Sequence, residues 1–342
     1  MRKKRVQSTV AYCLLLIVYC LFISCGSNPL DVDVSKVKVG EVKIKRFDKD
    51  LFSVNETNFN EKNSELKKNY GEYYLGFAQN LIWRRSVDDT LYKEHLLDFV
   101  SNADMKALYD ECVKNFSDVS DIEKDLTESF CHILFYFPET KLPVAVTTMT
   151  GFNSSISFAD SFYSIGMEMY LGERNKFYDY AQFPFYKRKV MNRYNIVPDF
   201  LKGWAMNTFP QDSSKEDLLS QMIYQGKILY LLDAFLPNSN DTSKIGYSEK
   251  QLKWCERNAS NIWSYIIENE MLYSSATEDV AKFINEGPFT SGFVKESPAR
   301  TGIWLGWQIV RKYMERTKST LKQLMEIKDA KKILDESKYK PN

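Results

Sequence analysis

Apolar residues recur three or four positions apart along most of this chain, which is the spacing of one face of an α-helix. The clearest run stands before Pro138 and consists of Ile122, Leu126, Phe130, Ile133, Leu134 and Phe137. Because proline cannot continue a helix, we expect this one to end just before it. The same spacing predicts helices over residues 215–235, 248–272, 277–284 and 300–317.

Two segments show the alternation that is typical of β-strands. Val37, Val39, Val42 and Ile44 alternate with charged residues around Gly40, which predicts a strand broken at the glycine. Residues 142–160 and 162–171 predict two or three more strands, which we expect to be antiparallel because their connections are short. The predicted fold class is α+β, dominated by helices, with a small mixed or antiparallel sheet packed against them.

The N-terminus has the pattern of an export signal. Four basic residues at positions 2–5 precede an apolar run over residues 10–23, which is too short for a comfortable membrane span. The run ends in Phe22-Ile23-Ser24-Cys25, which resembles a bacterial lipobox with its acylated cysteine. We predict a lipoprotein signal peptide over 1–24, a tether over 25–36 that is lipidated at Cys25, and a single domain over 37–342. An uncleaved anchor and a secretory signal with an incidental Cys25 are the alternatives.

The charges of the chain nearly cancel, with 46 Lys and Arg against 45 Asp and Glu and a formal net charge of +1. This balance excludes a protein that coats nucleic acid, and the 14% of aromatic residues excludes a disordered chain. Apart from the signal peptide and Cys25, the cysteines are Cys112, Cys131 and Cys255. These three allow at most one disulfide, or three buried thiols.

No established catalytic motif is present in the sequence. The chain has two histidines, His95 and His132, and neither has the second histidine that an H-E-x-x-H zinc site requires. Nucleophile elbows, phosphate-binding glycine loops and dinucleotide-binding fingerprints are missing as well. Paired carboxylates remain open as general acid and base, because they leave no sequence pattern.

Three stretches combine charged, aromatic and glycine residues. The first places Asp160 and Glu168 among the apolar residues of the predicted strands. The second is a helix with Gly226 in its middle, where glycine costs about 1 kcal/mol relative to alanine, so we expect a close neighbour there. Beside Gly226 stand Lys227 and Tyr230.

The third stretch, residues 296–313, begins a helix that carries two tryptophans, Trp304 and Trp307, followed by Gln308. Filling the core is the alternative to a binding role for these aromatic rings. We expect Arg300 in this stretch, and Lys227 in the preceding one, to form buried ion pairs or ligand contacts, with Asp160 or Glu168 as plausible partners.

In these stretches the sequence resembles the gliding-motility lipoprotein family GldB of the Bacteroidota. The resemblance rests on Arg46-Phe47-Asp48, on Tyr70-Gly71, on the Gly-Met-Glu-Met-Tyr-Leu-Gly segment that ends at Gly172, on the helix over 221–230, and on residues 297–308. It implies an outer-membrane lipoprotein that faces the periplasm, in a family tied to gliding motility and to the secretion system that shares its machinery. Because homologues also occur in relatives that do not glide, a broader role in the cell envelope is the alternative.

The GldB family is in turn similar to a group of predicted zinc peptidases with the zincin-like fold. When the chain is aligned with the H-E-x-x-H motif of these peptidases, Met222 and Gly226 take the positions of the two metal-binding histidines, and Ile223 takes the position of the general-base glutamate. The resemblance thus implies a degenerate zincin-like domain whose side chains at these positions bind no zinc and activate no water.

These inferences combine into a protein that binds without catalysing a reaction. We predict no catalytic residue, metal, cofactor or nucleic-acid partner; the predicted partners are the membrane, through Cys25, and a peptide or protein of the cell envelope. The predicted binding residues are Lys227, Tyr230, Arg300, Trp307, Gln308, Glu168 and Asp160. The alternatives are an envelope hydrolase that attacks peptide or peptidoglycan through carboxylates such as Asp160 and Glu168, and a structural scaffold without a groove.

Overall fold

A computed structural model describes residues 28–82, 85–214 and 216–341. Residues 28–33 belong to a unit separate from the one that begins at Val34, and the description below concerns the second unit. The predicted signal peptide and Cys25 lie outside the described residues.

The chain before the sheet is mainly helical, as the apolar spacing predicts. Its helices are α2 (Phe47–Phe52), α3 (Phe59–Phe77), the π-helix η1 (Ala78–Ile82), α4 (Tyr92–Ser101), α5 (Ala103–Asn115) and α6 (Ser120–Tyr136). The last of these ends two residues before Pro138, which confirms the expected end of that helix.

The sheet has three strands, β1 (Val144–Thr148), β2 (Ile156–Ala159) and β3 (Phe162–Gly166), in the order β1-β3-β2. A tight turn joins β2 to β3, and these two are antiparallel. The expectation of antiparallel pairing is wrong for β1, which runs parallel to β3 because β2 lies on the far side of β3. The prediction of an α+β fold with a small mixed sheet is confirmed.

Residues 37–44 do not form the predicted strand. Their alternation is real, but their backbone is held by side chains of α6: the Val42 amide donates to Thr127 Oγ1 (3.1 Å) and the Ile44 amide donates to Glu123 Oε1 (2.9 Å). Only Lys45 reaches the sheet, through an isolated parallel bridge to Val146. Because side chains of α6 take up these backbone donors, residues 37–44 do not join the sheet.

Helices follow the sheet to the C-terminus. They are η2 (Met167–Tyr170), α7 (Lys176–Tyr180), α8 (Phe185–Arg188), η3 (Arg193–Asn195), α9 (Ile196–Thr208), α10 (Leu218–Phe235), α11 (Asp241–Ile245), α12 (Glu249–Arg257), α13 (Ala259–Glu268), α14 (Thr277–Ile284), α15 (Thr301–Thr317), α16 (Leu321–Glu326) and α17 (Ala330–Ser337). The predicted helix over 277–284 matches α14. The predicted helix over 248–272 is divided at Asn258, whose side-chain amide donates to the Trp254 carbonyl (2.9 Å).

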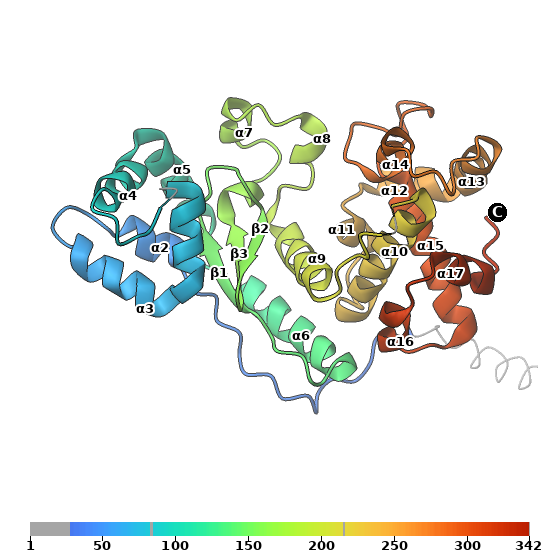
Figure 1. Ribbon diagram of the computed structural model, residues 1–342, viewed down its shortest axis with the longest axis horizontal. Coiled ribbons are helices and arrows are strands. Elements are labelled where there is room, and N and C mark those ends of the chain that lie inside the picture. The colour runs from blue at the N-terminus through green and yellow to red at the C-terminus, as the bar shows by residue number, and fades with distance from the viewer. Residues whose placement is uncertain (1–27, 83–84, 215, 342) are drawn as a thin grey trace, which may run out of the picture. The chain divides into compact units, whose positions relative to one another are not determined.

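The two faces of β3 are covered by different helices (Figure 1). Phe162 packs against Tyr73 of α3, with ring centroids 5.9 Å apart, while the next residue, Tyr163, packs against Phe200 of α9 at 5.8 Å. This is the alternation of a strand that is buried on both sides. The sheet thus joins the N-terminal helices to α9.

Helices α10 and α15 cross with their backbones in direct contact. A Cβ atom at Gly226 would lie 2.5 Å from the Gly306 carbonyl carbon, and one at Gly306 would lie 2.0 Å from the Met222 carbonyl oxygen. Both glycines are therefore required by packing, and the close neighbour expected at Gly226 is the backbone of α15.

We expect Gly226→Ala to lower the free energy of unfolding by about 3 kcal/mol, because the added methyl group meets backbone atoms that cannot move aside alone. The matched control is Gly76→Ala in α3, where an added Cβ would meet nothing within 4 Å. There alanine should stabilise the helix by up to about 1 kcal/mol. Urea unfolding of both variants checks this, and equal stability of Gly226→Ala and wild type would contradict the close crossing.

Candidate binding groove

The structure does not bring the seven predicted binding residues together. Trp307 is fully buried, and its indole Nε1 donates to Asp233 Oδ2 at 2.9 Å. The guanidinium of Arg311 lies 3.7 Å from the centre of the indole ring. Asp233 also accepts from Arg311 Nε (2.8 Å) and from Lys244 Nζ (3.0 Å). Trp307 is thus part of a buried network between α10, α11 and α15, and the core alternative applies to it.

Tyr230 and Gln308 lie next to this network. Tyr230 is half-buried on α10, and burial, followed by the negative charge of Asp233, raises the pKa of its hydroxyl to about 12. Gln308 is half-buried on α15, one residue after Trp307. Lys227 points elsewhere: its Nζ donates to the carbonyl of Ile327, between α16 and α17.

Glu168 and Asp160 stand at opposite ends of β3. Glu168 is fully buried in η2, where its Oε1 accepts from the Thr150 amide (2.6 Å), the Thr150 hydroxyl (2.7 Å) and the Phe152 amide (3.2 Å), and burial raises its pKa. Asp160 is exposed in the β2–β3 turn with a φ of 53°. Five strand residues separate the two by about 16 Å, beyond the roughly 5–10 Å at which paired carboxylates cooperate.

Arg300 finds a different partner from those expected. It precedes α15 with a left-handed φ of 60°, and its Nε lies 3.2 Å from Glu286 Oε1 rather than near Asp160 or Glu168. Its guanidinium stands over the ring of Tyr247, 5.4 Å from the centroid. A non-glycine residue in this conformation is held by its surroundings, here the ion pair and the ring.

A row of charges continues from Arg300 to α9. Burial, and then the positive charge of Arg300, lower the pKa of Lys202. Burial raises the pKa of Asp199, which accepts a hydrogen bond from the Tyr170 hydroxyl (3.0 Å). Charged groups are thus clustered where α9 and the start of α15 meet.

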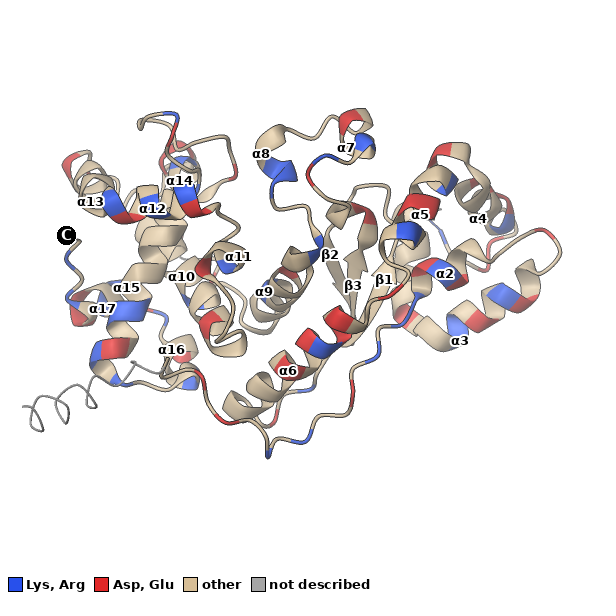
Figure 2. Ribbon diagram, turned by 180° about the vertical axis from the view of Figure 1, so that it is seen from behind, with Lys and Arg blue, Asp and Glu red and all other residues tan. Residues whose placement is uncertain are grey.

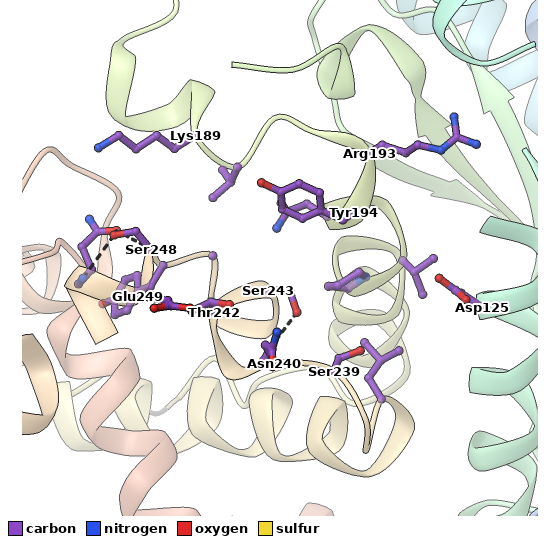
Figure 3. Close-up of a pocket in the computed structure, with 18 of the residues that line it drawn as sticks. Asp125, Lys189, Arg193, Tyr194, Ser239, Asn240, Thr242, Ser243, Ser248 and Glu249 are labelled. Carbon is purple, nitrogen blue, oxygen red and sulfur yellow. Dashed lines mark hydrogen bonds between the residues drawn. The ribbon is translucent and has the colours of Figure 1, made fainter. Parts of the chain in front are cut away.

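Arg300 and Tyr247 also line a cavity of about 1050 Å³, which we call the α6–α12 groove. Its walls are α6, the segment 186–198 and the turns around α11 and α12 (Figure 3). Figure 3 shows the ring of Tyr194 between these walls, above Asn240 and Ser243 of the α11 turn. Tyr194 is 72% exposed, so its ring is available to a ligand.

Acidic residues mark the ribbon of α6 in Figure 2, and basic residues mark α8. Asp121, Asp125 and Glu128 follow one another on α6 and all line the groove. Arg193 pairs with Asp121, whereas burial and then the charges of Asp121 and Glu128 raise the pKa of Asp125. Across the groove stand Lys189, after α8, and Lys250, in α12, together with the acidic residues Glu249 and Glu286, so that this wall carries both signs of charge.

Of the seven predicted binding residues, Arg300 lines this groove. The sequence patterns did not point to Tyr194, Asn240 or Ser243. These residues come from segments that are far apart in the chain and belong to no helical or strand period. One signal was available: residues 176–194 are rich in Tyr, Phe, Lys and Arg, and Tyr180, Phe185 and Tyr194 of this segment are exposed.

In the ranges that the structure describes, no group of three or more His, Cys, Asp or Glu residues is arranged to hold a metal ion. Cys112, Cys131 and Cys255 are free, the first and last of them buried. None of the helices in this part of the chain has the length and apolarity needed to cross a bilayer. Met222 and Gly226, the zinc-ligand positions of the peptidase alignment, pack against the backbone of α15.

A family model described as gliding motility protein GldB matches residues 27–341. No curated protein and no solved structure matches the chain. The sequence resemblance to this family is confirmed over nearly the whole chain, and the similarity to zinc peptidases stays a prediction.

We expect Asp233→Asn to lower the free energy of unfolding by about 3 kcal/mol, because it removes the buried carboxylate that Lys244 and Arg311 share and leaves only Asp241 to pair with them. The control is Asp335→Asn, which removes an exposed ion pair with Lys331 and should cost less than about 1 kcal/mol. Chemical denaturation of both variants provides the measurement. If both variants lost less than about 1 kcal/mol in the free energy of unfolding, the Asp233 network would not be what holds α10 to α15.

Proposed function

Because this chain belongs to the GldB family of gliding-motility lipoproteins, we propose that it is anchored in the outer membrane, faces the periplasm and binds a segment of an envelope polypeptide without catalysis. The anchor in this proposal is the acylated Cys25, followed by the tether over 25–36. The binding site is the α6–α12 groove.

The observation that carries the proposal is the size and lining of the groove. Its volume of about 1050 Å³ is at the upper end of what small-molecule pockets occupy, so it accommodates several residues of a polypeptide. Tyr194 offers an exposed aromatic ring, which is a common anchor in protein interfaces. Asn240 adds a side-chain amide that suits a peptide backbone, whereas the hydroxyl groups of Ser243 and Ser248 already donate within the wall, to the Asn240 carbonyl and to Gln251 Oε1.

The charges of the groove favour a segment of mixed charge. Asp125 and Glu128 on the α6 side form no ion pair with a described residue, and they would attract a basic side chain. Lys189 and Lys250 on the other side would attract an acidic side chain or a carbonyl group. A polypeptide supplies both within a few residues.

Binding without catalysis is favoured by how the other charged groups are used. Asp121 is held by Arg193, and Glu286 is held by Arg300, so these carboxylates are engaged in ion pairs. A degenerate zincin-like origin is compatible with this proposal, because Met222, Ile223 and Gly226 supply neither a zinc ligand nor a general base.

We expect Tyr194→Ala to abolish gliding at an unchanged protein level, because it removes the exposed anchor without disturbing the core. The matched control is Tyr273→Ala, which removes another exposed tyrosine, 58% accessible, outside the groove. Gliding speed and colony spreading are measured with each variant as the sole copy in the cell. Normal gliding with Tyr194→Ala would remove the groove as the functional site.

Substitution of Cys25 by serine should release the protein from the membrane fraction, because acyl chains supply the anchoring energy at about 0.8 kcal/mol per buried methylene. Cys131→Ser is the control and should stay with the membrane. Membrane retention of Cys25→Ser would favour an uncleaved anchor. A wild-type protein without acyl chains would show that Cys25 is incidental.

A further inference from the structure

A second cavity, of about 500 Å³, lies between the α9–α10 and α16–α17 connections. It shares no lining residue with the α6–α12 groove. About half of its lining is apolar and includes Phe209, Pro210, Ile223, Met325 and Ala330. The other half is polar and includes the exposed side chains of Asp212 and Lys328. Lys227, which stands next to the crossing glycine of α10, also lines it.

Lys227 is an unusual residue to find in such a lining. It is only 7% exposed, and its Nζ makes one hydrogen bond, to the Ile327 carbonyl. An ammonium group has three N–H donors, so two remain for other acceptors. No carboxylate among the described residues forms an ion pair with it, and burial lowers its pKa to about 8.

A purely structural role accounts for only part of this arrangement. The hydrogen bond to Ile327 helps to hold the connection between α16 and α17. An apolar side chain would fill the same volume without the cost of burying an amine. The unused donors and the adjoining cavity instead suit a ligand that brings its own negative charge.

We propose that this cavity binds an organic carboxylate with an apolar body. Its carboxylate would accept hydrogen bonds from Lys227 Nζ, and its apolar part would contact Phe209, Ile223 and Met325. A single buried cation matches a single negative charge, whereas a phosphate dianion would require more buried donors. The carboxylate can come from a fatty acid or from the C-terminal residue of a polypeptide, since both place an apolar group beside the acid.

The test uses the full mature chain with Cys25→Ser and isothermal titration calorimetry. Octanoate and octanamide have the same length and differ in charge, so octanoate should bind at least about tenfold more tightly. Acetate, which lacks the apolar body, should also bind at least about tenfold more weakly than octanoate. N-acetyl-leucyl-leucine and its C-terminal amide form a second matched pair. Tighter binding of this acid than of octanoate would identify a polypeptide C-terminus as the source, and the reverse order would identify a fatty acid.

Lys227→Met keeps the length of the side chain and removes its charge, so it should weaken binding of the preferred carboxylate by at least about tenfold. The control is Lys331→Met, which lies outside the cavity and should bind as wild type does. If Lys227→Met does not fold, the comparison of each acid with its amide, made on the protein that retains Lys227, still tests the proposal. Failure of both acids to bind, equal binding of acid and amide, or unchanged binding by Lys227→Met would each overturn the proposal.

Discussion

Backbone contact between α10 and α15 at Gly226 and Gly306 is the constraint on which the C-terminal half of the chain depends. A side chain at either position would meet main-chain atoms of the other helix, so the two helices have one closest approach. Seven residues further along α10, Asp233 binds Trp307, Arg311 and Lys244, which fixes the rotation of both helices and of α11. Small residues set the distance between the helices, and one carboxylate sets their orientation.

This crossing positions both candidate sites. The C-terminal end of α10 leads directly into the turns around α11 and α12, which form one wall of the groove. The N-terminal end of α15 begins at Arg300, whose left-handed backbone turns its side chain toward Glu286 and Tyr247. On α10, Lys227 follows the crossing glycine and lines the smaller cavity. Two candidate sites with different linings thus share one support, while the groove's remaining walls come from α6 and residues 186–198.

Local periodicity predicted the helices well where one face is apolar, as in α6, α14 and α15, whereas α10 is apolar on nearly all sides. The cost of a glycine within a helix pointed to the close approach at Gly226. Periodicity failed for residues 37–44, where side chains of α6 replace a neighbouring strand, and for β1, whose pairing depends on the path of the chain. The site was harder to predict, because Trp307 and Arg300 are close in sequence but one is buried against Asp233 while the other lines the groove. Tyr194 belongs to no run of regularly spaced apolar residues.

If the α6–α12 groove holds a polypeptide segment in the living cell, that segment lies within reach of position 194. The most direct measurement places a photo-crosslinking amino acid at position 194, with position 273 as the exposed control, and identifies the adducts by mass spectrometry. We expect a discrete polypeptide adduct at position 194 that is absent at position 273 and is lost when Asp125 and Glu128 are both changed to lysine. No adduct at position 194, or the same adducts at both positions, would contradict it.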